Sequence, residues 1–225
     1  MSSMSTSGSP AQGASNRRMG RAARVGIAAA LLAVAAVAAL LTRGLNRIRE
    51  EARDELPVLG RVPQFQFVNE RGQPFGTADL RGKAWVANFV FTRCPSICPL
   101  ITQKMAWLQR QTAGVGEAIH LVSFTVDPEY DSPEVLREYA RKHGADPARW
   151  TFLTGDPKRM RQTIVDGFKV GVGGSSTRQD VANLFHSTRF VLVDPTGGIR
   201  GYYRSEEAES MDQLVSQLNQ LAKSR

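Results

Sequence analysis

The sequence predicts one α/β domain with a mixed β-sheet flanked by helices, preceded by a single N-terminal transmembrane helix. Buried apolar runs alternate with helical patterns over residues 57–225, which is typical of βαβ units. Two further strand-like runs, 187–193 and 199–203, flank a Pro- and Gly-containing turn, so we expect a hairpin that adds an antiparallel edge to the sheet. An uncharged apolar run near the N-terminus predicts the membrane helix.

The N-terminal part divides into a tail and an anchor. Residues 1–24 are rich in Ser, Gly, Ala and Arg and have little to bury, so we expect a disordered basic tail. Residues 25–42 carry no charge, and as a helix the apolar run spans about 25 Å, at the short end for crossing a bilayer. The alternative is a cleavable signal peptide with a small-residue site at Ala36-Val37-Ala38.

Charge on the two sides of the anchor does not set its orientation, because four arginines precede it and four follow it. The amino flank is short and the folded mass follows the span, so we expect a single-pass protein of the cytoplasmic (inner) membrane. Its globular domain would lie on the periplasmic side. The basic flanks suit anionic lipid headgroups.

Residues 43–56 are predicted to be a charged linker, and residues 57–225 the globular domain. The net charge of +8 is not concentrated in that domain, and no Lys/Arg cluster there is interleaved with aromatic residues. The sequence therefore argues against nucleic-acid binding.

The elements of the domain are predicted from period-two and helical patterns and from their boundary residues. For the helix near 133, Ser132 is the expected cap and Pro133 the first helical residue. In chain order we expect strand 63–68, a return strand from Pro74, strand 85–91, helix 99–111, strand 120–126, helix 132–144, strand 150–153, helix 156–167, a Gly/Ser/Thr loop over 171–183, the hairpin, and a helix from 205.

Cys94 and Cys98 are the only two cysteines. They follow the apolar run 85–91 and precede a helical pattern, at a sheet edge where α/β folds place ligands. Backbone N–H groups at a helix start favour thiolate. At a spacing of four, helical cysteines share a face, so both sulfurs could hold a metal ion or bond to each other. Pro99 would interrupt a helix that runs from Pro95, which leaves open a loop or an irregular first turn.

A reactive pair is the favoured interpretation of these cysteines. Inert buried thiols rarely stand together between prolines, and a disulfide closing so short a loop would stabilise the fold only weakly. Two cysteines cannot hold a four-cysteine iron–sulfur cluster, and a closed zinc site wants four Cys or His ligands. Two thiolates with one imidazole suit Cu(I).

Three histidines and two aspartates are the other residues considered for this site. His120, at the start of a strand, and His143, at a helix end, are expected to be structural. His186 follows the Gly/Ser loop and is a candidate ligand. Asp127 follows a buried strand at the cysteines' sheet edge, where it could support the ligands or face a partner. Asp131 is expected to belong to a turn and helix cap.

Three motifs resemble the SCO/SenC family of membrane-anchored copper chaperones. They are Phe-Thr-Arg-Cys94-Pro-Ser-Ile-Cys98-Pro, then Val-Asp127-Pro-Glu-Tyr-Asp-Ser-Pro, and then His186 ahead of Phe-Val-Leu-Val-Asp-Pro-Thr-Gly. The resemblance covers residues 57–225. It implies a thioredoxin-like fold, copper ligands at Cys94, Cys98 and His186, and the family's acidic strand-end residue at Asp127.

The resemblance also implies partners and roles. The cargo would be copper, carried as Cu(I), with Cu(II) as a second state that the ligands could hold. It would be taken from a copper donor protein and passed to the binuclear copper centre of cytochrome c oxidase subunit II. Thiol–disulfide exchange on that subunit is a compatible alternative. A peroxide-reducing thioredoxin-like enzyme and a redox or copper sensor remain open, so the sequence leaves enzymatic activity undecided.

Overall fold

The computed structural model describes residues 34, 37, 40–42, 56–95, 97–169 and 188–223. The chain divides into two compact units, residues 1–55 and 56–225. In the first unit the described residues are helical and exposed. Among the described residues, no helix has the length and apolar character needed to cross a membrane. The predicted tail, most of the predicted span 25–42 and most of the linker lie outside the described residues.

The second unit is built on one eight-stranded sheet whose strand order is β1-β8-β7-β4-β5-β6-β2-β3. The three central strands β4, β5 and β6 are parallel to one another, and all other neighbours are antiparallel. The strands are β1 (Gly60–Arg61), β2 (Gln66–Asn69), β3 (Pro74–Gly76), β4 (Ala84–Val90), β5 (Ile119–Thr125), β6 (Trp150–Thr154), β7 (Arg189–Val193) and β8 (Gly198–Arg204).

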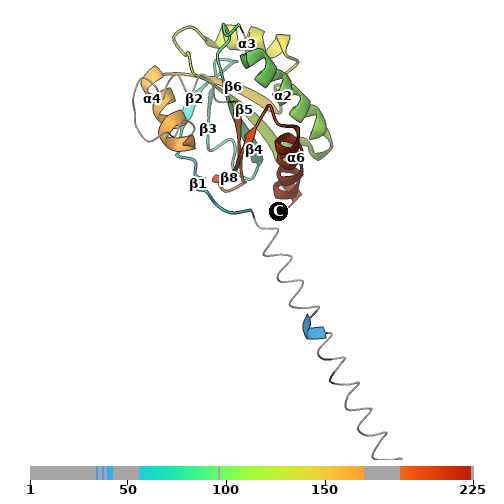
Figure 1. The fold of residues 1–225 in the computed structure, drawn as a ribbon. Helices are drawn as coiled ribbons and strands as arrows, with labels where there is room; N and C mark the ends of the chain where they lie inside the picture. Colours follow the sequence, from blue (N-terminus) through green and yellow to red (C-terminus); the bar gives the residue numbers. More distant parts are fainter. Residues whose placement is uncertain are drawn as a thin grey trace, which may run out of the picture. The chain divides into compact units, whose positions relative to one another are not determined.

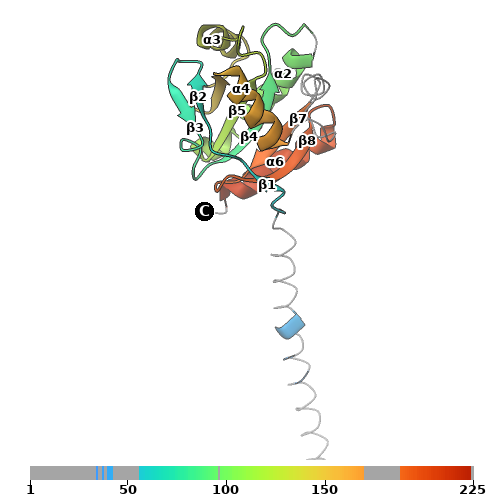
Figure 2. The same ribbon diagram turned by 90° about the vertical axis from the view of Figure 1, so that its left-hand side faces the viewer.

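Helices cover both faces of this sheet, as Figures 1 and 2 show. The helical elements are α2 (Ile97–Gln111), η1 (Ala113–Ala118), α3 (Pro133–Lys142), α4 (Pro157–Gln162), η2 (Thr163–Gly167) and α6 (Ala208–Lys223). One core cluster joins α2, α3 and α6 to one face of the sheet. A second cluster joins α4, η2 and the segment before β4 to the other face. The β4, β5 and β6 side chains are buried throughout, because both faces are covered.

The predicted α/β class with a mixed sheet and flanking helices is confirmed. Each strand and helix that the sequence predicts over the described residues lies within a few residues of its expected position, and Ser132 caps α3 by accepting a hydrogen bond from the Val135 N–H at 3.3 Å. One expectation was wrong: the C-terminal hairpin is not an edge. β7 pairs with β4 inside the sheet, and β8 is covered by the short strand β1, which the sequence did not reveal.

Candidate metal centre

The two cysteines lie at the connection between the end of β4 and the start of α2. β4 ends at Val90, a short turn follows in which the Cys94 N–H donates to the Phe91 carbonyl at 3.3 Å, and α2 begins at Ile97. Cys94 therefore precedes the helix and Cys98 is its second residue. Both are free thiols and both are buried, with 8% and 3% of their surface exposed.

The structure brings the two side chains together at the helix start. The Cys98 N–H donates to the sulfur of Cys94 at 3.5 Å. That amide belongs to the first turn of α2, where N–H groups have no partner within the helix. Pro99 also falls in this turn and removes no helical hydrogen bond there. The helix therefore starts before Pro99, which answers the alternative that the sequence left open.

Burial controls the protonation of Cys98. It raises the pKa of Cys98 to about 12; the Cys94 thiol and the charge of Asp131 add to this, and a backbone hydrogen bond with Phe91 partly offsets it. In the metal-free protein Cys98 is thus a neutral thiol at pH 7. A metal ion binding here must displace its proton.

A line of hydrogen bonds ties the first turn of α2 to α3. The Thr102 hydroxyl donates to the Cys98 carbonyl at 2.8 Å, and it shares a second hydrogen bond of 2.8 Å with the Tyr139 hydroxyl. All three residues are buried. The backbone of Cys98 is therefore held from behind by the helix that follows β5.

Asp127 lies beside the cysteine loop, linked to it by Arg93. The Arg93 Nε is 2.7 Å from the Asp127 carboxylate, and its guanidinium carbon lies 4.8 Å from the centre of the Tyr130 ring. Arg93 is 60% exposed at its side chain and Asp127 is 16% exposed. Arg93 is the direct neighbour of Cys94 in the chain, so this ion pair connects Asp127 to the cysteine loop.

Asp131 is the supporting residue that the sequence analysis missed. It is fully buried, and its carboxylate accepts hydrogen bonds from the Thr92 N–H, the Thr92 hydroxyl and the Thr125 hydroxyl. Burial raises the pKa of Asp131, while the two hydroxyls act in the opposite direction. The sequence signal was a second acidic residue four positions after Asp127, which a turn and a helix cap explained equally well.

The three histidines are placed differently from one another. His186, the predicted third ligand, lies outside the described residues. His120 lies in β5, buried, with its Nε2 2.9 Å from the Thr151 hydroxyl. His143 caps α3, where burial and then the charge of Lys142 lower its pKa, so the structure does not favour the charged ring expected from its helix-end position.

The two cysteine sulfurs suit a soft metal ion. Two adjacent, water-shielded sulfurs are the ligands that Cu(I) prefers. No group of three His, Cys, Asp or Glu side chains among the described residues could hold a metal ion. Cys94 and Cys98 are therefore two candidate ligands.

The fold and the site define the class before any comparison. A mixed sheet flanked by helices, with two cysteines where a central strand passes into a helix, is a thioredoxin-like α/β architecture. The SCO1/SenC family model matches residues 57–223 of this chain. The chain belongs to the SCO1/SenC family.

Three individual proteins illustrate this relationship. The SCO1 protein homolog of Bacillus subtilis (strain 168) is 31% identical over 71% of this chain and 82% of its own length. The structure of BsSco, described with a disulfide switch and as a Sco-family cytochrome c oxidase assembly protein, is 28% identical, with a TM-score of 0.65 over 76% of this chain and 99% of that one. Copper-bound yeast Sco1 is 27% identical, with a TM-score of 0.55 over 75% and 99%.

Proposed function

We propose that this protein is a copper chaperone for cytochrome c oxidase assembly, which binds copper through Cys94, Cys98 and His186. The observation that carries the proposal is the contact between the Cys98 N–H and the Cys94 sulfur, which puts two buried thiols at one helix start. Membership of a family with a copper-bound member supports it. The proposed acceptor is the binuclear copper centre of subunit II, and a copper donor protein supplies the ion.

The surroundings of the cysteines suit the capture and release of an ion. Both thiols lose their protons when copper binds, and the buried position of Cys98 makes that loss costly without the metal. The first turn of α2 is fixed by Thr102 and the preceding loop by Asp131. The backbone around Cys94 and Cys98 is therefore held in place. We propose that His186 is the ligand that leaves the copper ion when it passes to a partner.

We also place the domain on a membrane anchor. The described part of residues 25–42 presents exposed apolar side chains on a helix, at Val34, Val37, Leu40 and Leu41. Such side chains are stable in lipid and costly in water. The proposed arrangement is one span of the inner membrane with the copper-binding domain on the periplasmic side.

The test is a Cu(I) competition titration of the full chain in non-ionic detergent, reduced and free of oxygen. We expect one ion per chain, with affinity lowered by about tenfold or more in C94S, C98S and H186A. H143A is the matched control, a histidine at the C-terminal end of α3, and should bind as the parent does. Parent protein that loses all copper to the chelator would overturn the proposal, whereas an unchanged H186A would remove only His186.

A second function is supported by the free state of the same two cysteines. In thiol–disulfide exchange, Cys94 and Cys98 would give up two electrons and two protons to a disulfide of subunit II. They would become a disulfide themselves while the partner's becomes two thiols. Mixing the reduced chain with oxidised subunit II and counting thiols on each protein tests this. Equal reduction by a C94S/C98S variant would exclude it.

A further inference from the structure

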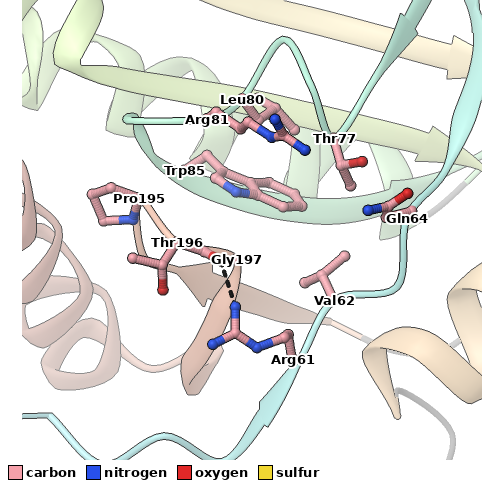
Figure 3. Close-up of a pocket in the computed structure, with 10 residues that line it drawn as sticks. All are labelled: Arg61, Val62, Gln64, Thr77, Leu80, Arg81, Trp85, Pro195, Thr196 and Gly197. Carbon is pink, nitrogen blue, oxygen red and sulfur yellow. Dashed lines mark hydrogen bonds between the residues drawn. The ribbon is translucent and has the colours of Figure 1, made fainter.

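A cavity of about 270 Å³ lies at the opposite end of the sheet from the cysteines. Three segments form it: the extended chain after β1, the turn before β4, and the β7–β8 turn. Figure 3 shows it with Trp85 at its centre and Arg81 and Arg61 on opposite sides of that ring. Trp85 begins β4 and Cys94 follows its end, so about 20 Å of strand separates the two places.

Two solvent-exposed arginines, Arg61 and Arg81, line the cavity. Arg61 donates from Nη1 to the Thr196 carbonyl at 2.7 Å, and neither Arg61 nor Arg81 forms an ion pair with any described residue. The carboxylates nearest in the chain are occupied. Asp79 accepts from the Gly76 N–H at 2.8 Å, and Asp194 pairs with Arg200 at 2.5 Å.

Trp85 supplies a third donor. Its side chain is only 2% exposed, yet its indole N–H makes no hydrogen bond with a residue that the structure describes. In Figure 3 the indole nitrogen lies on the edge of the ring nearest Pro195 and Thr196, inside the lining. The indole nitrogen is not among the fully buried atoms that lack a partner, so this N–H is open to the cavity and can donate to a ligand there.

We propose that this cavity binds the phosphate group of a phosphate ester. Two guanidinium groups on opposite sides and an indole N–H can together donate to an oxyanion that has several acceptor oxygens. The paired N–H donors of a guanidinium match two oxygens of a phosphate group. The polar side chains of Gln64 and Thr77 complete the lining, and the described lining holds no carboxylate. Nothing in this site uses the cysteines, so the proposal stands apart from copper binding.

Two sources could provide the group. A soluble ester would reach the cavity from solution. An anionic phospholipid headgroup would reach it from the membrane on which we place the chain, since Arg61 lies five residues after Leu56 and the 43–56 linker extends at most about 50 Å. This lipid source alone rests on the proposed anchor. The two sources differ chemically, because the headgroup is a phosphodiester and common soluble esters are monoesters.

The experiment is calorimetric titration of the full chain in non-ionic detergent at constant ionic strength. Glycerol 3-phosphate represents the monoester, and glycerophosphoglycerol represents the phosphatidylglycerol headgroup. We expect saturable binding of one of them, weakened about tenfold or more in R61Q/R81Q and more mildly in W85F. R110Q, which removes an exposed arginine of α2, is the matched control and should bind as the parent does.

Each outcome is decisive. Preference for the diester assigns the lipid source, and preference for the monoester assigns the soluble one. No saturable binding of either ester, or equal binding by R61Q/R81Q and the parent, would overturn the proposal. Cu(I) retention by R61Q/R81Q, measured in parallel, verifies that the variant is folded and keeps this result separate from the fate of the copper proposal.

Discussion

The carboxylate of Asp131, in the loop after β5, is hydrogen-bonded to Thr92, in the loop after β4. The Asp131 carboxylate accepts from the Thr92 N–H at 3.2 Å and from the Thr92 hydroxyl at 2.5 Å, although 39 positions separate the two residues. Thr92 is two residues before Cys94. A fully buried carboxylate in the loop after β5 therefore fixes the loop that carries the first cysteine.

We expect D131A to lower the free energy of unfolding by about 2 kcal/mol, because the buried Thr125 hydroxyl and the half-buried Thr92 would lose their acceptor. The cysteine loop would also loosen, so copper should dissociate faster. Urea unfolding and stopped-flow transfer of Cu(I) to a chelator measure the two effects. D212N, at an exposed position of α6, should change stability by less than about 0.5 kcal/mol. Wild-type stability and copper release in D131A would contradict this account.

The sequence could predict where the two cysteines lie in the fold, because their position depends on local patterns. Cys94 and Cys98 stand between an apolar run and a helical pattern, and both patterns are carried by neighbouring residues. The helix start was less certain, because Pro99 was treated as a breaker. Its position within the first turn of α2 makes it harmless there.

Long-range relationships were beyond that reasoning. The link from Asp131 to Thr92 depends on β4 and β5 lying side by side, and a single sequence does not give the partners of a side chain in a loop. The strand order has the same origin. β7 inserts next to β4 rather than forming an edge, because the sheet as a whole decides which strand completes its core. His186 lies outside the described residues, so its role stays a prediction.

The Arg93–Asp127 pair should matter little for stability. Its guanidinium is largely in water, so a double-mutant cycle of R93Q and D127N should give little or no coupling energy. The matched control is R141Q with E138Q, another exposed pair, at 2.6 Å on α3. If the pair presents the site to a partner, R93Q and D127N should slow copper transfer to subunit II while chelator competition stays unchanged. Equal transfer rates in all variants would restrict the pair to a structural role.

His120 should make the fold sensitive to mild acid. Burial, with the charges of Lys83, Arg149 and Arg71, lowers its pKa to about 4, against 6.5 when unfolded. The unfolded chain therefore takes up the proton first as pH falls. The contribution to stability is complete above about pH 6.5 and is lost progressively down to about pH 4, and the loss at pH 4.5 is about 2 to 3 kcal/mol.

Urea unfolding of the parent and of H120Q at pH 7 and 4.5 measures this contribution. The parent should lose about 2 to 3 kcal/mol more than H120Q between these values, since glutamine does not titrate and keeps a polar group near the Thr151 hydroxyl. H143Q, a less buried histidine at the end of α3, is the comparison and should keep most of the parent's pH dependence. The same loss in H120Q and the parent would assign the acid sensitivity to other groups.

Removing the Tyr139 hydroxyl should weaken the support behind Cys98. Y139F takes away the hydrogen bond with Thr102 but leaves the Thr102 hydroxyl donating to the Cys98 carbonyl. Because the site is buried, we expect a loss of about 1 kcal/mol in unfolding free energy, with only a small drop in Cu(I) affinity. Y202F is the control, because the Tyr202 hydroxyl makes no hydrogen bond with any described residue.

Comparing the double variant Y139F/T102V with the two single variants measures how strongly Tyr139 and Thr102 depend on each other. T102V alone breaks both bonds of Thr102, so it should cost more than Y139F and should free the first turn of α2. Since Y139F leaves no further partner for T102V to break on that side, the two losses should add up to more than the loss in the double variant. Fully additive losses would show that Tyr139 and Thr102 stabilise the fold independently of each other.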